Sequence, residues 1–470
     1  MSITVCGVME SYYSVLIIGG GNAGLCAALS AAEHTSDILL VEAAPKPERG
    51  GNTKYTRDIR YAHGIDGYTT GEYPDDEFVN DVVRVTNHNT DVDLLKMVVS
   101  ESRNIPSWLQ NKDVLIHKAL KGTLHLGRTN LFMFGGGKAM VNSYYAAAEK
   151  LGIKIEYNTK CTDLEFSGNR VTNASLNGPE GNRTVKVGSV VVASGGLEAN
   201  LEWLSEYWGS ATGNFIVRGT RHNRGELLQV LLRHKTKTIG NLSQFHSVAV
   251  DARSPKFDGG IVTRIDSIPY SITVNRDGNR FYDEGEDLWP KRYAIWGRLI
   301  AEQPDQLAFS IVDSKAINLF LPTVFEPVRD DTIPGLAIKL GISPENLSRT
   351  VMEYNQSLKR KCTFNPGILD DCSTSGLAVP KSHWAAPIDS PPFYGYSFRP
   401  GITFTYYGVK VNSKGQVLSD NGNPNRNLFA AGEIMSGNIL SEGYLAGFGL
   451  TIGTVFGITA GKEAVSAARS

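Results

Sequence analysis

The chain begins with short apolar runs on either side of a longer one. Val15–Ile18 is a short run that ends at Gly19, an alanine-rich apolar run follows as far as Leu29, and a second short run, Ile38–Val41, ends at Glu42. Short apolar runs bounded by turn residues are typical of buried strands, and a longer alanine-rich run is typical of a helix. This stretch therefore predicts a strand, a glycine turn, a helix and a second strand with an acidic residue at its end.

The later part of the chain continues this pattern, departs from it and returns to it. Further strands are expected over 153–157, 161–166, 170–176, 185–193, 409–411 and 428–431. Helices are expected over 74–112 with a break at Pro106, and over 139–151, 225–238 and 445–468. Between about 244 and 400 the chain is richer in proline, arginine and aromatic residues. A region of different amino-acid composition, flanked on both sides by the strand and helix pattern of the first part, predicts an inserted domain.

The length supports the same division. A chain of 470 residues is too long for one ordinary hydrophobic core, so two domains are expected. We expect an α/β nucleotide-binding domain split between 1–243 and 403–470, with 244–402 inserted as a second domain.

The turn after the first strand carries the most informative motif, Gly19-x-Gly21-x-x-Gly24. In a dinucleotide site the first glycine permits the tight turn, the second lets the backbone approach a pyrophosphate, and the third lets helix and strand pack closely. The helix N-terminus would hold the phosphates, and Glu42 would accept hydrogen bonds from ribose hydroxyls. An ordinary βαβ turn is the alternative, but it does not account for Glu42.

Composition narrows the class of protein. The net charge of −1 argues against a nucleic-acid surface. The sequence contains no run of 18 apolar residues, so we expect no membrane span, and the N-terminus lacks the features of a signal peptide. The five cysteines form no metal-binding pattern, so we expect no metal site, a reducing compartment and a cytoplasmic location.

Several glycine loops favour FAD over NAD, because an extended FAD needs more than one close backbone approach. The second and third loops follow strands at Gly195-Gly196 and Gly432-Glu433. The residues expected to bind the cofactor are Gly19, Gly21, Asn22, Ala23, Gly24, Glu42, Ala43, Gly50, Gly51, Asn52, Thr53, Ala193, Ser194, Gly195, Gly432, Glu433, Gly449 and Leu450.

These motifs, in this order, resemble the fumarate reductase/succinate dehydrogenase flavoprotein family. The resemblance implies a Rossmann-like FAD-binding domain, split in sequence, with an inserted α+β capping domain. It implies that His246, in Gln244-Phe-His246, holds a substrate carboxylate, and a four-residue insertion would bring Arg292 to the place of the family's proton-transfer arginine. Because no histidine lies at 49–57, we expect FAD to be bound non-covalently.

Two departures change the expected substrate. Thr403-Phe404 stands where the family has paired histidines, and Tyr444 stands where it has a substrate arginine. The runs 278–298, 391–401 and 438–457 instead resemble the tricarballylate dehydrogenase branch. Enzymes of that branch oxidise propane-1,2,3-tricarboxylate to cis-aconitate and, in bacteria, pass electrons to a membrane iron–sulfur partner.

The chemistry of such a reaction can be matched to residues. The flavin takes a hydride, a base takes the proton next to a carboxylate, and cations hold the carboxylates. Arginine suits the last task because its planar fork matches a carboxylate. Arg292 and Tyr444 are the expected acid/base groups, and the expected substrate-binding residues are His246, Arg399, Arg264, Arg218, Arg221 and Thr403.

Two other functions remain open at this point. A 3-ketosteroid Δ1-dehydrogenase would use tyrosines for proton transfer, and the number of arginines in the inserted region favours a carboxylate substrate instead. A flavoprotein that only relays electrons, as in corrin biosynthesis, would be expected to have an additional metal-binding part.

Overall fold

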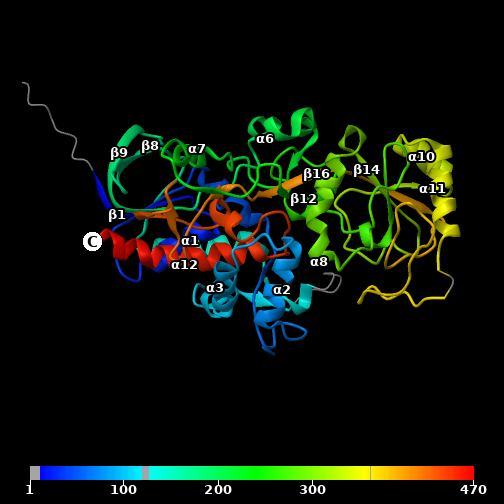
Figure 1. Ribbon diagram of the computed structural model, residues 1–470, viewed down its shortest axis with the longest axis horizontal. Coiled ribbons are helices and arrows are strands. Elements are labelled where there is room, and N and C mark those ends of the chain that lie inside the picture. The colour runs from blue at the N-terminus through cyan, green and yellow to red at the C-terminus, as the bar shows by residue number, and fades with distance from the viewer. Residues whose placement is uncertain (1–10, 119–125, 360) are drawn as a thin grey trace, which may run out of the picture.

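The computed structural model describes residues 11–118, 126–359 and 361–470 (Figure 1). Two sheets lie towards opposite ends of an elongated molecule, and helices pack around each of them. The larger sheet is formed by both ends of the chain, so that α1 and α12 lie side by side. This agrees with the expected α/β domain split in sequence.

The larger sheet has the strand order β18-β19-β9-β1-β2-β6, and the β7–β8 hairpin continues from β9. The neighbours of β1 and β9 in the centre are parallel, and Ile18 and Ala430 both lie level with Val192. The carboxyl ends of three strands therefore end together, and the three glycine loops meet at one edge. The strands are β1 (Tyr12–Ile18), β2 (Ile38–Val41), β6 (Lys154–Glu156), β7 (Lys160–Ser167), β8 (Arg170–Gly178), β9 (Gly181–Val192), β18 (Gln416–Leu418) and β19 (Pro424–Ala430).

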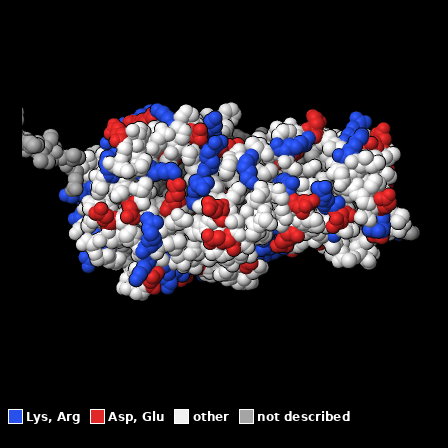
Figure 2. Space-filling model, turned by 90° about the horizontal axis from the view of Figure 1, so that it is seen from above, with Lys and Arg blue, Asp and Glu red and all other residues white. Residues whose placement is uncertain are grey.

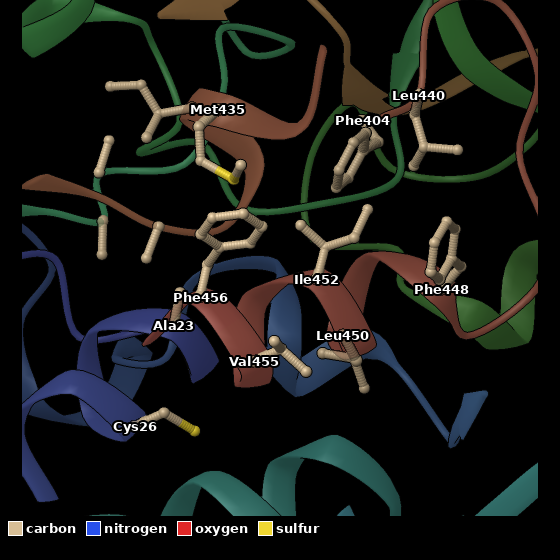
Figure 3. Close-up of a cluster of buried hydrophobic side chains, with 14 of the residues drawn as sticks. Ala23, Cys26, Phe404, Met435, Leu440, Phe448, Leu450, Ile452, Val455 and Phe456 are labelled. Carbon is tan, nitrogen blue, oxygen red and sulfur yellow. The ribbon is translucent and has the colours of Figure 1, made fainter. Parts of the chain in front are cut away.

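Helices α1 (Asn22–Ala31) and α12 (Phe448–Ala468) pack closely because glycines line their contact. A Cβ at Gly457 would lie 2.5 Å from the Ala23 carbonyl oxygen, and one at Gly461 would overlap that of Ala27. Apolar side chains of α12 such as Ile452, Val455 and Phe456 fill the space around this contact (Figure 3). The last helix therefore fixes the first one beneath the glycine turn.

The second sheet is built around the long strand β16 (Phe393–Thr405), which pairs with β10, β12, β14 and β15, while β13 pairs with β14. Its other strands are β10 (Ile216–Val217), β12 (Phe245–Asp251), β13 (Ile272–Asn275), β14 (Ala308–Val312) and β15 (Val328–Asp330). Because β10 precedes residue 244 and β16 runs through residue 402, this sheet extends past both predicted boundaries of the inserted domain. The exact division of the chain stays a prediction.

The remaining elements cover the two sheets. The helices are α2 (Asp75–Val85), α3 (Val92–Ser102), α4 (Ile105–Gln110), α5 (Gly136–Lys150), α6 (Leu201–Trp208), α7 (Glu226–Arg233), α8 (Trp289–Arg292), α9 (Trp296–Ala301), α10 (Ile333–Leu340) and α11 (Pro344–Gln356). Short strands form a β3–β5–β4 sheet and a β11–β17 pair, with bounds β3 (Asp58–Arg60), β4 (Ile116–His117), β5 (Asn130–Met133), β11 (Thr238–Ile239) and β17 (Gly408–Val409).

Most elements lie where the sequence pattern predicts them, with two exceptions. The break expected at Pro106 is wrong, because the helical region is interrupted at 86–91 and 103–104, and Pro106 lies in the first turn of α4, where a missing N–H is tolerated. The helix expected over 225–238 ends at Arg233, and β11 begins at Thr238. Lys235 has a positive φ of 55°, which interrupts helical geometry and allows the backbone to turn into the strand. The predicted length of this helix was therefore wrong.

The cysteines are not all free. Cys362 and Cys372 form a disulfide in the inserted region, whereas Cys26 and Cys161 are buried thiols. This disulfide weakens the inference of a reducing compartment from the cysteines, and the cytoplasmic location stays a prediction. Among the described residues, no helix is both long and apolar enough to cross a membrane. On the face shown in Figure 2, acidic and basic side chains are interspersed.

The packing of α1 on α12 generates a prediction. Alanine normally stabilises a helix relative to glycine by about 1 kcal/mol. At Gly461 we expect the reverse, a loss of about 1–3 kcal/mol, because the new methyl group would press on the backbone of α1. Urea unfolding followed by circular dichroism measures the change. Gly213→Ala is the control, since a Cβ there meets nothing within 4 Å, and an unchanged or raised midpoint for Gly461→Ala would contradict the packing argument.

Candidate functional site

One long cavity runs from the three glycine loops to the inserted sheet. At one end it is lined by the turn of residues 19–23, by Glu42 and by the loops 193–195 and 431–433. At the other end, which we call the recess, it is lined by Arg218, His246, Ile261, Arg264, Tyr293, Thr403, Phe404 and Tyr444. The glycine loops expected to bind a nucleotide and the charged side chains of the recess therefore line the same cavity.

The glycine turn fits a dinucleotide for the reasons that the motif predicts. Gly19 has a φ of 107°, and a Cβ at Gly24 would overlap the Gly19 carbonyl oxygen. Gly21 differs, because its φ is −80° and a Cβ there would meet only ordinary contacts of 3.6 Å and longer. Protein packing therefore requires glycine at 19 and 24, whereas the space in front of Gly21 belongs to the cavity. No side chain caps α1 at Gly21, so the helix N-terminus faces that space.

Glu42 lies at the end of β2 and is buried. Its carboxylate accepts hydrogen bonds from the backbone N–H groups of Gly20 (3.1 Å) and Ala44 (2.9 Å). Burial raises its pKa, and these N–H groups act in the opposite direction. Each carboxylate oxygen can accept a further bond, so Glu42 remains able to bind a ribose hydroxyl.

Asn52 connects the nucleotide end to the recess. Its side-chain amide donates to Glu198 Oε1 (2.6 Å) and to the Thr403 carbonyl (2.8 Å), and its oxygen accepts from the Thr220 N–H (2.8 Å). All the polar atoms of this amide are engaged with protein, so Asn52 holds three segments together at the cavity wall.

A pair of buried carboxyl groups lies beside Asn52. Glu433 accepts a hydrogen bond from the Thr405 N–H (2.8 Å), and Glu198 accepts one from the Asn223 amide (2.7 Å). Burial raises the pKa of Glu433 well above its ordinary value, and the negative charge of the neighbouring Glu198 raises it further. Burial raises the pKa of Glu198 as well, so this pair resists carrying two negative charges.

Arg218 is the first cation of the recess. It follows β10 and its N–H bonds to the Ile402 carbonyl of β16 (2.9 Å), which fixes its backbone on the second sheet. Its Nε donates to Thr403 Oγ1 (2.8 Å), while the buried Nη1 has no partner among the described residues. Burial lowers the pKa of Arg218 to about 10, and nearby Arg264 acts in the same direction. At neutral pH the side chain is a buried cation with a free donor.

Arg264 is the second cation, and it is partly compensated. Its Nη2 lies 2.8 Å from Asp266, both side chains are buried, and its Nε has no partner among the described residues. Burial opposes the ionisation of Asp266, but Arg264 holds the pKa of this carboxyl below its usual range. The pair is therefore charged, and the recess as a whole keeps the positive charge of Arg218.

His246 lies on β12, opposite Phe404 of β16. Both ring nitrogens are buried without a partner among the described residues, and the ring stacks on Tyr444 with 4.1 Å between centroids. Burial lowers the pKa of His246 well below its ordinary value, and the two arginines act in the same direction. The imidazole is therefore neutral and offers one donor and one acceptor to a ligand.

Two tyrosines complete the recess. The Tyr444 hydroxyl accepts a hydrogen bond from the Gly449 N–H (3.0 Å) at the start of α12, and burial raises its pKa. The guanidinium carbon of Arg264 lies 4.8 Å from the centre of the Tyr293 ring, and Tyr293 is also buried. Tyr293 is not among the predicted site residues, because the family resemblance points to the arginine before it.

Three of the residues predicted for catalysis or substrate binding do not line the cavity. Arg292 is paired with Glu286 and bonded to the Tyr282 hydroxyl (3.2 Å). Arg221 pairs with Asp258 at 3.1 Å, and Arg399 donates to backbone carbonyls of residues 305 and 306. The described structure thus brings Arg218, Arg264, His246, Thr403 and Tyr444 together and leaves these three arginines outside.

The cavity also includes residues that no sequence motif indicated. Thr159, Lys160 and Cys161 line it where β7 begins, and Arg57 and Asp58 line it near the recess. These residues reach the cavity through pairing of β6 and β3 with distant strands, which has no local sequence signal. Gly24 and Gly50 are not among the residues that line the cavity, and their role in binding the cofactor stays a prediction.

Residues 14–444 match a protein-family model described as an FAD binding domain. The chain belongs to this FAD-binding family. FAD is therefore its cofactor, and the expected Rossmann-like FAD-binding fold is confirmed.

Two relatives of this protein have longer chains. NADH:fumarate oxidoreductase of Klebsiella pneumoniae strain 342 is 26% identical over 97% of this chain and 48% of its own length. The probable fumarate reductase Ifc3 of Shewanella frigidimarina is 25% identical over 96% of this chain and 74% of its own. This chain thus spans about half the length of the first relative.

Two solved structures share the fold. The open conformation of a flavocytochrome c3 fumarate reductase has a TM-score of 0.74 at 21% identity, and covers 98% of this chain and 79% of that chain. The 3-ketosteroid Δ1-dehydrogenase of Sterolibacterium denitrificans has a TM-score of 0.76 at 16% identity, and covers 97% of this chain and 100% of that chain. At these identities the likeness concerns the fold alone.

The residues of this FAD-binding chain fit the cofactor. The N-terminus of α1 suits the pyrophosphate, although its first N–H, that of Asn22, is bonded to Thr53 Oγ1 (3.0 Å). Glu42 suits the ribose, and the cavity also includes Glu433 and the recess. A flavin ring at the recess would adjoin Arg218, His246 and Tyr444.

Gly21 offers a direct test of this fit. We expect Gly21→Val to fold normally, because the protein leaves room for its Cβ, but to lose FAD, because the side chain enters the space of the pyrophosphate. Flavin fluorescence titration of the apoprotein measures the affinity, with Gly64→Val as a control at an exposed glycine with open space. Tight FAD binding by Gly21→Val would show that the dinucleotide lies elsewhere.

Proposed function

We propose that the protein is an FAD-dependent oxidoreductase acting on a carbon–carbon bond next to carboxylates, with oxidation of tricarballylate to cis-aconitate as the first candidate reaction. The main support is the recess, in which Arg218 Nη1 and Arg264 Nε are buried and unpaired. Leaving a buried charged donor unpaired is costly, and an anionic ligand would relieve that cost. Carboxylate is the anion whose geometry best matches a guanidinium.

The positions of the other groups support the same chemistry. Bound FAD supplies hydride transfer, and the protein supplies binding, orientation and proton transfer. Arg218 and Arg264 would hold carboxylates and stabilise the negative charge that develops on the substrate carbon. Neutral His246 would donate to a carboxylate oxygen, in agreement with its predicted role. Tyr444 would orient the substrate through its hydroxyl, and the burial of all these groups keeps water from the reacting carbon.

Within the described part of the chain, the arginines that line the recess are Arg218 and Arg264, so Arg221, Arg292 and Arg399 would contact a tricarboxylate only if the inserted region moved on binding. We keep tricarballylate as the first candidate because of the resemblance described above, and propose non-covalent FAD and a membrane iron–sulfur electron acceptor on the same basis. A ketosteroid dehydrogenase is the second candidate, supported by the aromatic side chains of Tyr293, Phe404 and Tyr444 in the recess.

The substrate class can be tested by anaerobic mixing of the holoprotein with tricarballylate, succinate and a 3-ketosteroid while the flavin absorbance is followed. We expect bleaching by tricarballylate, and by succinate more weakly because it has one carboxylate fewer. Bleaching by the steroid alone would overturn the carboxylate assignment. No bleaching by any compound would favour a protein that relays electrons without a substrate of its own.

Arg218→Met provides the matching prediction for the site. The substitution removes the Arg218 guanidinium and with it the unpaired positive charge of the recess. The substrate concentration for half-maximal bleaching should therefore rise about 10- to 100-fold, as expected for the loss of a charge-assisted hydrogen bond. Arg276→Met is the control, because Arg276 forms an exposed ion pair with Asp305 away from the cavity. An equal concentration for Arg218→Met and the control would exclude Arg218 from substrate binding.

A further inference from the structure

The segment that carries Arg292 presents a different residue to the cavity. In α8, Trp289 Nε1 donates to Asp266 Oδ1 at 2.7 Å, and Asp266 is the partner of Arg264 in the recess. Tyr293 directly follows α8 and lines the recess, whereas Lys291 and Arg292 turn away to Asp81 and Glu286.

The surroundings of the Tyr293 ring suit a group that exchanges a proton. Arg264 lies over the ring, and the His246 ring meets it edge-on with 5.3 Å between centroids. Among the described residues, the Tyr293 hydroxyl has no hydrogen-bond partner that affects its pKa. Tyr444 differs, since its hydroxyl already accepts a bond from Gly449. Tyr293 therefore has the free hydroxyl and the neighbouring positive charge that a proton-transfer group needs.

We propose that Tyr293, and not Arg292, transfers the proton to and from the substrate carbon. This inference rests on the proposed function. During oxidation the C–H bond next to the carboxylate breaks and an O–H bond forms on the Tyr293 phenolate, while the adjacent carbon gives its hydride, with both electrons, to FAD. During reduction the Tyr293 hydroxyl gives that proton back and is left as the phenolate.

The charges around Tyr293 determine the effect of pH. Burial raises the pKa of Tyr293 to about 12, Arg264 and Arg218 lower it, and Asp58 and Arg60 also face it with opposite effects. His246 is neutral and contributes no charge over the useful range. The phenolate is the form that accepts a proton, and it is rare at pH 7. As long as the pH stays below 12, each rise of one pH unit makes the phenolate about tenfold more abundant. The rate of flavin reduction by substrate should therefore rise with pH.

Tyr293→Phe tests the proposal because it keeps the ring beneath Arg264 and removes only the hydroxyl. With whichever compound bleaches the wild-type flavin, we expect single-turnover reduction at saturation to fall at least about 100-fold. The dissociation constant of that compound, measured by calorimetry on the oxidised holoprotein, should change less than about threefold. Between pH 6.5 and 9.5 the wild-type rate should increase steeply, and the residual rate of Tyr293→Phe should not.

Two comparison variants separate the possible outcomes. Arg292→Met should leave the reduction rate intact; a large loss in Arg292→Met together with full activity of Tyr293→Phe would overturn the proposal and restore the arginine. If Tyr444→Phe alone abolished the pH dependence, the proton would belong to Tyr444 and the proposal would fall. A wild-type flavin that no compound bleaches would instead overturn the proposed function, and the assignment of Tyr293 with it.

Discussion

The chemistry of the recess depends on buried arginine side chains whose positive charge is not fully paired by the described part of the protein. Two guanidinium groups lie buried within one cavity, and among the residues that the structure describes one carboxylate, that of Asp266, is paired with them. Burying a charge without full pairing costs free energy, and proteins retain such arrangements mainly at functional sites. The adjoining imidazole of His246 also has no partner for either ring nitrogen among the described residues, and its single N–H is available to an anion. A bound carboxylate would accept hydrogen bonds from donors of this set.

The fold fixes the charged residues of the recess on the second sheet and connects this sheet to the FAD-binding domain. Arg218 is fixed to β16 through β10, and His246 is fixed to the same strand through β12. Asn52 then ties β16 at Thr403 to the wall of the FAD-binding domain. Because α1 and α12 hold the glycine turn from below, the nucleotide end and the recess are positioned by separate but connected parts of the core.

The sequence predicted the nucleotide end better than the recess, and the reason is physical. The glycine turn, Glu42 and the loops after β9 and β19 are local patterns in which backbone geometry requires particular residues. The charged residues of the recess come from separate elements, and no local pattern tells a buried arginine from one on the surface. Arg218 and Arg264 were thus grouped with Arg221 and Arg399, and the orientation of one short helix put Tyr293 where Arg292 was expected. The disulfide between Cys362 and Cys372 likewise depends on a loop whose path has no sequence signal.

A crystal structure of the FAD-loaded protein with tricarballylate would test the central claim most directly. The account predicts a substrate carboxylate within hydrogen-bond distance of Arg218 Nη1 and Arg264 Nε, with the Tyr293 hydroxyl beside the carbon that loses its proton. A tricarballylate bound outside the recess, or a recess whose guanidinium nitrogens are both occupied by the cofactor itself, would contradict it.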